Sequence, residues 1–276
     1  MRLQSKVAFI TGAARGQGRA HAIRLAKEGA KVVIIDACTQ IDSVPYPLPD
    51  PGELALTARL VEEAGGAVLA RQVDVRDSDG LNKAVADGLS AFGRLDIVCA
   101  NAGITSHAKT WEHTEAQWND IIDINLTGVW RTVKATVPPM IKLGQGGSII
   151  ITSSTAGLKG INNHASYCAA KHGVVGLART LAYELAPHRV RVNTVHPTSV
   201  DTPMIQNDHE YRLFVPDHPH PTRGDVEPAF SQLNLIPGTP WLDPDEISSA
   251  IVYLASDEAR YVTGIALPVD AGNLSR

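Results

Sequence analysis

Short runs of hydrophobic residues alternate along this chain with longer stretches in which hydrophobic positions recur every three or four residues. The short runs are typical of β-strands, and the longer stretches are typical of amphipathic helices. Predicted strands cover 6–10, 31–36, 67–73, 95–100, 148–152, 190–195 and 265–269. Predicted helices cover 16–28, 53–64, 78–92, 115–122, 125–143, 165–185 and 245–255. Strands and helices therefore alternate over the whole sequence.

Some of the predicted strands are hydrophobic at almost every position instead of at alternate positions. Lys31–Asp36 reads KVVIID and Leu95–Ala100 reads LDIVCA. Such runs are typical of strands that are buried on both faces of a parallel sheet. The sequence therefore predicts an α/β fold, a Rossmann-like doubly wound parallel sheet of about seven strands with helices on both faces and right-handed crossovers. We expect residues 1–276 to form a single domain.

Proline interrupts this rhythm at three places. The stretch 37–52 is rich in proline and indicates an inserted loop, called the insertion below. The stretch 203–240 contains many prolines and several histidines. A long loop in a compact domain is usually functional or disordered, so we interpret 203–240 as a lid over a substrate site. Pro138 and Pro139 should kink or break the helix in which they lie.

Composition narrows the class of protein. Of the 276 residues 44% are hydrophobic, which is enough for a large core, and 20% are charged, which argues against disorder. The net charge of −4 argues against nucleic acid as a partner. We expect no transmembrane helix and no signal peptide, because no long hydrophobic run occurs and the N-terminus leads directly into a strand. Cys38, Cys99 and Cys168 lie far apart and predict neither a disulfide nor a zinc site, as is typical of the cytoplasm.

The first predicted strand leads into a glycine-rich turn, Thr11-Gly12-Ala13-Ala14-Arg15-Gly16-Gln17-Gly18, and then into a helix. Glycines let the backbone approach a pyrophosphate closely, and a helix N-terminus attracts that anion. A glycine-rich sequence alone can be only a turn, but its position in the first strand–helix–strand unit favours a dinucleotide site. The predicted cofactor-binding residues of this turn are Gly12, Arg15, Gly16, Gln17 and Gly18.

Asp36 ends the second predicted strand. A carboxylate at this position accepts hydrogen bonds from the adenosine ribose hydroxyls and repels a 2′-phosphate, which favours NAD over NADP. Arg15 keeps NADP open as an alternative, because its guanidinium could bind that phosphate. Asp74 and Val75 close the third strand and are candidates for the adenine site, although the same residues would also suit the start of a helix.

Tyr167 and Lys171 are four residues apart on a predicted helix and therefore share a face. A free phenol has a pKa of about 10, and a nearby ammonium group lowers the pKa of a phenol. Tyr167 could then act as a general base toward an alcohol or as a general acid toward a ketone. Ser154 lies just past a strand end, where ligands gather in such sheets, and could orient the substrate oxygen. Ser153 is the alternative.

Taken in order, these segments resemble the short-chain dehydrogenase/reductase family over nearly the whole chain. The segments that carry the resemblance are Thr11–Gly18, Asn101-Ala102-Gly103, Asn125, Ser154, Tyr167 with Lys171, and Pro197–Thr202. The resemblance implies an NAD-dependent alcohol dehydrogenase whose catalytic residues are Asn125, Ser154, Tyr167 and Lys171. In this family the asparagine supports a water that leads from the lysine to solvent.

The resemblance also implies the remaining cofactor contacts. These are Asn101, Ala102 and Gly103 beneath the adenosine side, Tyr167 and Lys171 at the nicotinamide ribose, and Pro197, Val200 and Thr202 at the carboxamide. The Pro-Gly that is common in the family is Pro197-Thr198 here, which leaves the local backbone path open. Because the tyrosine fills the acid–base role, His196 is not expected to be catalytic. The spacing of the lid histidines His209, His218 and His220 predicts no metal site.

The insertion and the His196-Pro197-Thr198 turn resemble a carveol-dehydrogenase-like subgroup of the family. This resemblance implies cyclic terpenoid alcohols as substrates, and tightly held NAD that is re-oxidised by the redox carrier mycofactocin. Family members are often homotetramers. Three alternatives stay open: a 3-oxoacyl or steroid ketoreductase with exchanging NAD(P)H, a non-catalytic NAD-sensing or scaffold protein, and a nucleic-acid binder. The presence of Tyr167, Lys171 and Ser154 argues against the second alternative, and the acidic net charge argues against the third.

Overall fold

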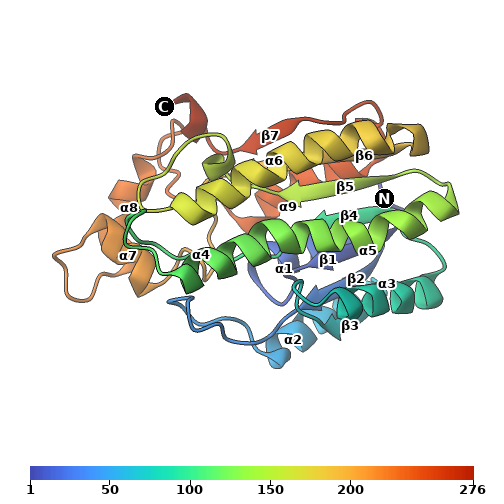
Figure 1. Ribbon diagram of the computed structural model, residues 1–276, viewed down its shortest axis with the longest axis horizontal. Helices are drawn as coiled ribbons and strands as arrows, with labels where there is room; N and C mark the ends of the chain where they lie inside the picture. Colours follow the sequence, from blue (N-terminus) through green and yellow to red (C-terminus); the bar gives the residue numbers. More distant parts are fainter.

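A sheet of seven parallel strands lies at the centre of the computed structural model, which describes residues 1–276 (Figure 1). The strands are β1 (Val7–Thr11), β2 (Lys31–Asp36), β3 (Val68–Gln72), β4 (Ile97–Ala100), β5 (Gly147–Thr152), β6 (Val190–Pro197) and β7 (Ala266–Val269). Their order across the sheet is β3-β2-β1-β4-β5-β6-β7. The chain first adds β2 and β3 on one side of β1, and then returns to add β4 to β7 on its other side. Ligands bind at the carboxyl ends of the strands at such a switch point, which here lies between β1 and β4.

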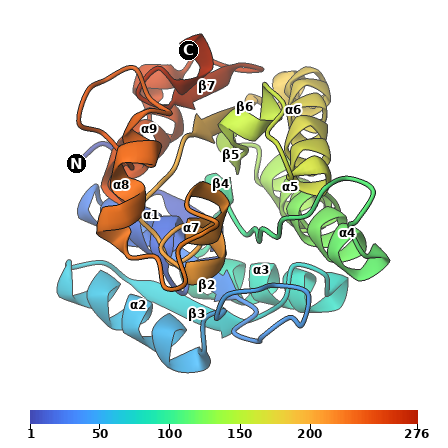
Figure 2. The same cartoon turned by 90° about the vertical axis from the view of Figure 1, so that its left-hand side faces the viewer.

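Helices cover both faces of this sheet (Figure 2). They are α1 (Gly16–Lys27), α2 (Pro51–Glu63), α3 (Ser78–Phe92), α4 (Glu115–Ile122), α5 (Gly128–Leu143), α6 (Ala165–Leu185), α7 (Asp208–Phe214), α8 (Arg223–Ser231) and α9 (Pro244–Ala255). The core residues of α3, α5 and α6 form a cluster of 30 buried hydrophobic residues with one face of the sheet. Those of α1, α2 and α9 form a cluster of 25 with the other face. Both faces are buried to a similar extent, so the predicted doubly wound fold is confirmed.

The strands show why the sequence runs are hydrophobic throughout. In β1, Val7 and Phe9 belong to the first cluster, whereas Ala8 and Ile10 belong to the second. Successive side chains of a strand point to opposite faces, and here each face needs a hydrophobic partner. Alternation between hydrophobic and polar residues is therefore absent.

The two helices predicted at 115–122 and 125–143 form one continuous helical segment in the structure. A π-helical turn at Asp123–Thr127 joins α4 to α5. Such turns carry one extra residue per turn and are common at functional sites. This π-helical turn contains Asn125, whose side chain is buried.

Pro138 and Pro139 were expected to kink or break the helix, and a break is wrong, because α5 continues through both prolines to Leu143. Val133 and Met140 lie on either side of the prolines and are both buried in the core. Packing against the sheet therefore keeps the helix continuous although two backbone N–H donors are missing.

The stretch 203–240 is not a loop throughout, because it contains α7 and α8. Asn207 caps α7 by accepting a hydrogen bond from the Glu210 N–H, and Thr222 forms a capping box with Asp225 at the start of α8. The two helices share a small hydrophobic cluster of their own, which contains Tyr211, Val226 and Phe230. Figure 2 shows them in orange, in front of the strands.

We find no helix in the structure that combines the length and the hydrophobicity needed to cross a membrane.

Candidate active site

Two adjoining cavities lie at the carboxyl edge of the sheet. The smaller, of about 150 Å³, is lined by the glycine-rich turn, the insertion and the ends of β2 and β3. The larger, of about 490 Å³, is lined by residues that follow β5 and β6, by the start of α6 and by the lid. Asn101, Gly103 and Thr202 line both cavities. The two cavities therefore form one continuous candidate site.

The glycines of the first turn are required by close backbone approaches. Gly12 has φ +66°, and a Cβ atom there would lie 2.7 Å from Ala102 Cα. A Cβ atom on Gly18 would lie 2.0 Å from the carbonyl oxygen of Gly12. No side chain caps the N-terminus of α1. The N–H groups of its first turn, at Gly16 and Gln17, are thus suited to binding an anion.

Asp36 lies at the edge of the smaller cavity, at the end of β2. Its carboxylate accepts hydrogen bonds from the N–H groups of Ala14 at 3.0 Å and Cys38 at 3.2 Å. Burial raises the pKa of Asp36, while these hydrogen bonds and the charge of Arg15 oppose that shift. The carboxylate is thus held at the place where an adenosine ribose would lie in a dinucleotide fold.

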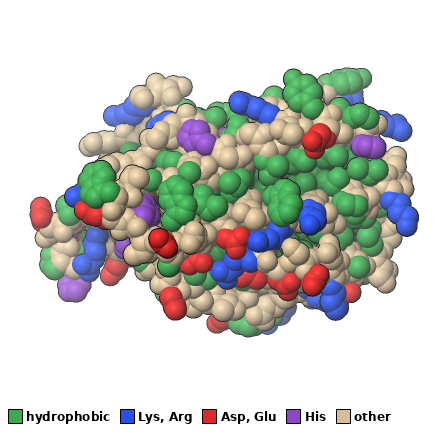
Figure 3. All heavy atoms as spheres, in the orientation of Figure 1, with side chains coloured by type: hydrophobic (Ala, Val, Ile, Leu, Met, Phe, Trp, Pro, Cys, Tyr) green, Lys and Arg blue, Asp and Glu red, His purple; other side chains and the backbone are tan.

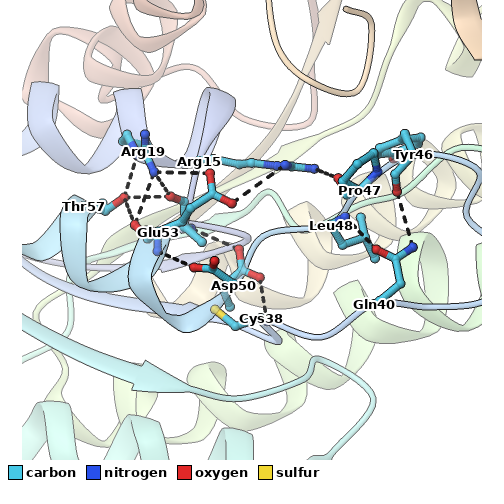
Figure 4. Close-up of polar contacts among 12 residues, drawn as sticks. Arg15, Arg19, Cys38, Gln40, Tyr46, Pro47, Leu48, Asp50, Glu53 and Thr57 are labelled. Atoms are coloured by element: carbon cyan, nitrogen blue, oxygen red, sulfur yellow. Dashed lines mark hydrogen bonds and ion pairs between the residues drawn. The ribbon is translucent and has the colours of Figure 1, made fainter. Parts of the chain in front are cut away.

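Arg15 points toward the insertion (Figure 4). Its guanidinium donates a hydrogen bond to the carbonyl oxygen of Pro47 and lies 3.9 Å from the carboxylate of Glu53. The guanidinium of Arg19 lies 3.8 Å from the same carboxylate. Arg15 is therefore engaged in holding the insertion, which weakens its case as a ligand for a 2′-phosphate.

The insertion is an ordered loop braced by the side chain of Gln40. The amide nitrogen of Gln40 donates to the carbonyl oxygens of Val44 at 3.2 Å and Tyr46 at 3.3 Å, and its oxygen accepts from the N–H of Leu48 at 2.8 Å. The Tyr46 hydroxyl accepts a hydrogen bond from the N–H of Thr105 at 3.2 Å, which ties the loop to the segment after β4. This side of the smaller cavity is consequently closed by a braced loop (Figure 4).

Asp74 and Val75 also line the smaller cavity. Burial raises the pKa of Asp74, but hydrogen bonds from the backbone and guanidinium of Arg76 outweigh it and leave the pKa below its ordinary value. Val75 is buried, and a Cβ atom on Gly128 would lie 2.6 Å from its side chain. Asp74 thus offers a charged acceptor and Val75 a packed hydrophobic wall.

Asn101 links three strands beneath the cavities. The N–H groups of Asn101 and Ala102 both donate to the Thr11 hydroxyl at 3.0 Å. The Thr152 hydroxyl donates to the Asn101 side-chain oxygen at 3.2 Å. A Cβ atom on Gly103 would lie 3.3 Å from the side-chain oxygen of Asn125, so this glycine permits close packing. The Asn101-Ala102-Gly103 segment therefore braces the floor of the site.

Asn125 holds the segment that follows β4. Its side-chain amide donates to the carbonyl oxygen of Ile104 at 2.8 Å and accepts from the N–H of the same residue at 2.9 Å.

Lys171 Nζ donates to the carbonyl oxygen of Thr152 at 2.8 Å. Burial lowers the pKa of Lys171 to about 8. The ammonium group is thus close to losing its proton at a mildly alkaline pH.

Tyr167 faces the larger cavity from the first turn of α6. Burial raises its pKa to about 12, against a lowering contribution from a hydrogen bond with Ser154. Lys171 Nζ lies 5.4 Å from the centroid of the Tyr167 ring. In the protein alone the pKa of the phenol therefore lies above its ordinary value, contrary to the expectation of a lowered pKa. The phenol is protonated at neutral pH.

The two candidate serines differ in what their hydroxyls do. Ser153 Oγ donates to the carbonyl oxygen of Lys171 at 2.9 Å and is buried. Ser154 Oγ accepts from the N–H of Ala156 at 3.1 Å and lines the larger cavity. Ser154 Oγ lies on the cavity wall beside the Tyr167 hydroxyl, whereas Ser153 Oγ is bonded to the backbone, which favours Ser154 over Ser153.

Pro197, Val200 and Thr202 line the larger cavity after β6. The backbone at Thr198 has no positive φ, so threonine occupies the usual glycine position without strain. Thr202 Oγ1 donates to the carbonyl oxygen of Val200 at 3.3 Å. The backbone path left open by the sequence is therefore an ordinary one.

His196 is fully buried. Its Nδ1 lies 2.7 Å from the carbonyl oxygen of Ser154, and its Nε2 lies 2.7 Å from the Thr194 hydroxyl. Burial lowers its pKa to about 4, so the ring is neutral. These contacts give His196 a positioning role toward Ser154.

Sequence reasoning missed a polar cluster that contacts the larger cavity, formed by His107, His164 and Glu210. His107 Nε2 lies 2.6 Å from a carboxylate oxygen of Glu210, and the ligand-type atoms of all three lie within 4.8 Å of one another. His209 stacks on His107 with ring centroids 4.9 Å apart. The spacing along the sequence contained no sign of the cluster, because its members come from separate segments. The expectation that the chain binds no metal stays a prediction.

Comparisons with known proteins agree with this geometry. Residues 6–212 match the sequence profile of the short chain dehydrogenase family. The chain is 52% identical to (-)-trans-carveol dehydrogenase of Rhodococcus erythropolis, over 98% of each chain. A crystal structure of carveol dehydrogenase from Mycobacterium avium in complex with NAD superposes with a TM-score of 0.98 at 51% identity, over 100% of this chain and 99% of that one. A short chain dehydrogenase from Mycobacterium paratuberculosis bound to NAD gives a TM-score of 0.91 at 43% identity, over 100% of both chains.

Proposed function

The chain belongs to the short-chain dehydrogenase family, and from this premise we propose that it oxidises carveol-like cyclic terpenoid alcohols to ketones. It is an NAD-dependent oxidoreductase that interconverts a secondary alcohol and a ketone. The observation that carries the proposal is that Ser154, Tyr167 and Lys171 meet in one cavity that is continuous with the glycine-rich turn.

The residues of the smaller cavity fit a dinucleotide. Gly12, Gly16, Gly18 and the first N–H groups of α1, including that of Gln17, would hold the pyrophosphate. Asp36 would accept hydrogen bonds from the adenosine ribose, as its position at the end of β2 favours NAD. The adenine would lie against Asp74 and Val75, and Asn101, Ala102 and Gly103 would form the floor. The nicotinamide end would be held by Tyr167, Lys171, Pro197, Val200 and Thr202.

The proposed mechanism gives each catalytic side chain one task. Bound NAD⁺ supplies the acceptor for the hydride that leaves the carbinol carbon. Ser154 donates a hydrogen bond to the alcohol oxygen, and Tyr167, as the phenolate, accepts the hydroxyl proton. Lys171 and Asn125 provide the route by which that proton reaches solvent. The alcohol becomes a ketone, and one proton is released.

The insertion supports the further proposal that NAD is held tightly. Gln40 braces this loop, Arg15 bonds to Pro47, and Tyr46 bonds to the segment after β4, so the adenosine side is covered by several hydrogen bonds. A cofactor that cannot leave must be re-oxidised in place, and we propose the redox carrier mycofactocin as the partner. Residues 203–240 would then act as a separate lid over the alcohol.

We also propose a cytoplasmic homotetramer. Trp118, Trp130 and Tyr183 are exposed on α4, α5 and α6, with 40%, 46% and 86% of their surface accessible. Figure 3 shows hydrophobic side chains spread over this face. Exposed hydrophobic residues on neighbouring helices are typical of subunit interfaces. The three cysteines are free thiols, as expected in a reducing compartment.

The deciding experiment records the near-ultraviolet absorbance of NADH after carveol is added to purified protein, first without and then with added NAD. The proposal expects about one NADH per chain without added NAD, and no increase with excess NAD. A signal that requires added NAD and keeps growing would contradict tight retention. Tyr167→Phe should abolish the signal while the bound NAD is retained. Unchanged turnover in that variant would contradict the assigned mechanism.

One observation favours a second candidate function, the reduction of 3-oxoacyl or steroid ketones with exchanging NAD(P)H. The pKa of Tyr167 is raised to about 12, so the phenol carries the proton that a ketone must receive. Ketone-dependent consumption of added NADPH would support this candidate. Its absence, together with the single turnover described above, would exclude it.

A further inference from the structure

The larger cavity contains a carboxylate that hydride transfer does not require. Glu210 lies in the first turn of α7 and lines the cavity together with Ser154 and Tyr167. Only 7% of its surface is accessible. A buried carboxylate costs free energy unless its oxygens accept hydrogen bonds. The partners of this group are therefore informative.

One oxygen of Glu210 is held and the other is open. His107 Nε2 lies 2.6 Å from Oε2. His107 is itself fixed, since His209 stacks on it at 4.9 Å and His164 packs against it with ring centroids 4.2 Å apart. Oε1 accepts no hydrogen bond from the chain. The carboxylate thus presents an acceptor with a fixed position at the cavity wall.

This acceptor lies within reach of a substrate that is bound at Tyr167. His164 contacts both groups: its ring centroid lies 6.2 Å from that of Tyr167, and one of its nitrogens lies within 4.8 Å of the Glu210 carboxylate. Glu210 is also close enough to raise the pKa of Tyr167 through its charge. A cavity of about 490 Å³ accommodates a small cyclic molecule that spans the two groups.

We propose that Glu210, positioned by His107, forms a second polar subsite that accepts a hydrogen bond from a hydroxyl of the substrate remote from the reacting carbinol. The preferred substrates are cyclic alcohols with a second, remote hydroxyl, and an alcohol with a single hydroxyl, such as carveol, is a poorer substrate. A carboxylate accepts but does not donate, so it selects a hydroxyl over an oxo group at the remote position. Its charge disfavours substrates that carry a carboxylate of their own. This inference rests on the proposed function and refines its substrate class.

The test compares the second-order rate constant for NADH formation in a single turnover, measured by stopped flow, for trans-cyclohexane-1,4-diol and for cyclohexanol in the wild type and in Glu210→Leu. The ratio cancels any general change in the lid. It should favour the diol in the wild type and fall about tenfold to hundredfold in the variant, because a hydrogen bond to a charged group is lost. Asp208→Leu removes an exposed acidic residue from the same turn of α7 and should leave the ratio unchanged. Glu210→Gln should increase the turnover of trans-4-hydroxycyclohexanecarboxylate.

An equal ratio in the wild type and Glu210→Leu would overturn the proposal. A diol preference that disappears with EDTA would also overturn it, in favour of a metal ion held by His107, His164 and Glu210. Failure of the proposed function has a different signature, namely no NADH from any alcohol. In that case calorimetric titration of the diol into the two proteins still tests the subsite, and equal affinities would overturn it.

Discussion

Burial acts on Tyr167 and Lys171 in opposite directions, because the phenol is neutral when protonated and the ammonium group is charged. The pKa of Tyr167 rises to about 12 and that of Lys171 falls to about 8. At mildly alkaline pH the phenol therefore keeps its proton, whereas the lysine begins to lose its proton. Alcohol oxidation needs the opposite state of the phenol, so pH should affect the two reaction directions differently.

We expect the single-turnover rate of alcohol oxidation to rise between about pH 7 and about pH 10, as the fraction of phenolate increases. Ketone reduction, which needs the protonated phenol, should not rise over the same range. Initial rates in both directions, at saturating substrate, measure this difference. Parallel pH profiles in the two directions would contradict the role assigned to Tyr167.

His21 makes a second prediction at the scale of single residues. It is fully buried between α1 and α9, with Nδ1 2.8 Å from the Ser248 hydroxyl, and burial lowers its pKa to about 3 from 6.5. Between pH 6.5 and about 3, His21 is protonated in the unfolded chain and neutral in the folded chain. The free energy of unfolding should therefore decrease by about 1.4 kcal/mol per pH unit as the pH falls through this window.

Replacement His21→Asn removes this titration, so its urea-unfolding free energy should decline less steeply than that of the wild type between pH 6.5 and about 3. The difference in slope is the readout, since loss of packing shifts the free energy equally at every pH. Parallel declines in the two proteins would show that His21 is charged in the folded state.

At the scale of elements, the sequence predicts best those helices whose ends carry local signals. The bounds of α3 and α4 agree with prediction because Asp77 caps the first and Thr114 forms a capping box on the second, while Gly93 ends α3 in a left-handed conformation. The strands agree within a few residues because their hydrophobic runs are buried on both faces. These features depend on neighbours in the sequence.

The two helices within 203–240 and the polar cluster were beyond such reasoning. Helix α7 has only seven residues, and prolines on both sides of it dominated the pattern. The contact between His107 and Glu210 joins residues 103 positions apart. Neither residue carries a motif, so only the folded chain brings them together. Family resemblance predicted that Ser154, Tyr167 and Lys171 meet, and the structure brings them to one cavity, while their catalytic roles stay a prediction.

The insertion gives a prediction at this scale. Gln40→Ala removes the hydrogen bonds to Val44, Tyr46 and Leu48 that brace the loop. The release of bound NADH, followed by its fluorescence after mixing with excess NAD⁺, should become about tenfold faster, which corresponds to about 1.4 kcal/mol. Asp42→Ala changes an exposed residue of the same loop and should release NADH at the wild-type rate. Equal rates of NADH release from Gln40→Ala and from the wild type would show that the braced loop does not retain the cofactor.

At the scale of the whole molecule, the proposed tetramer depends on the exposed aromatic residues of α4, α5 and α6. Trp130→Glu places a charge on that face and should reduce the molar mass in solution below that of a tetramer, as measured by light scattering. Trp111→Glu changes a residue with 81% of its surface accessible outside these helices and should leave the mass unchanged. A wild-type protein that is monomeric at all concentrations would contradict the proposal.

The two halves of the site have separate covers, the insertion over one and α7 with α8 over the other. If the insertion stays closed and α7 and α8 move, the alcohol would enter and the ketone would leave before the redox carrier arrives to re-oxidise the bound NADH. Such an order of events gives ping-pong kinetics. The direction of reaction would then follow the ratio of oxidised to reduced carrier and not the NAD⁺/NADH ratio of the cell. The insertion would thereby isolate one oxidation from the redox state of the shared nucleotide pool.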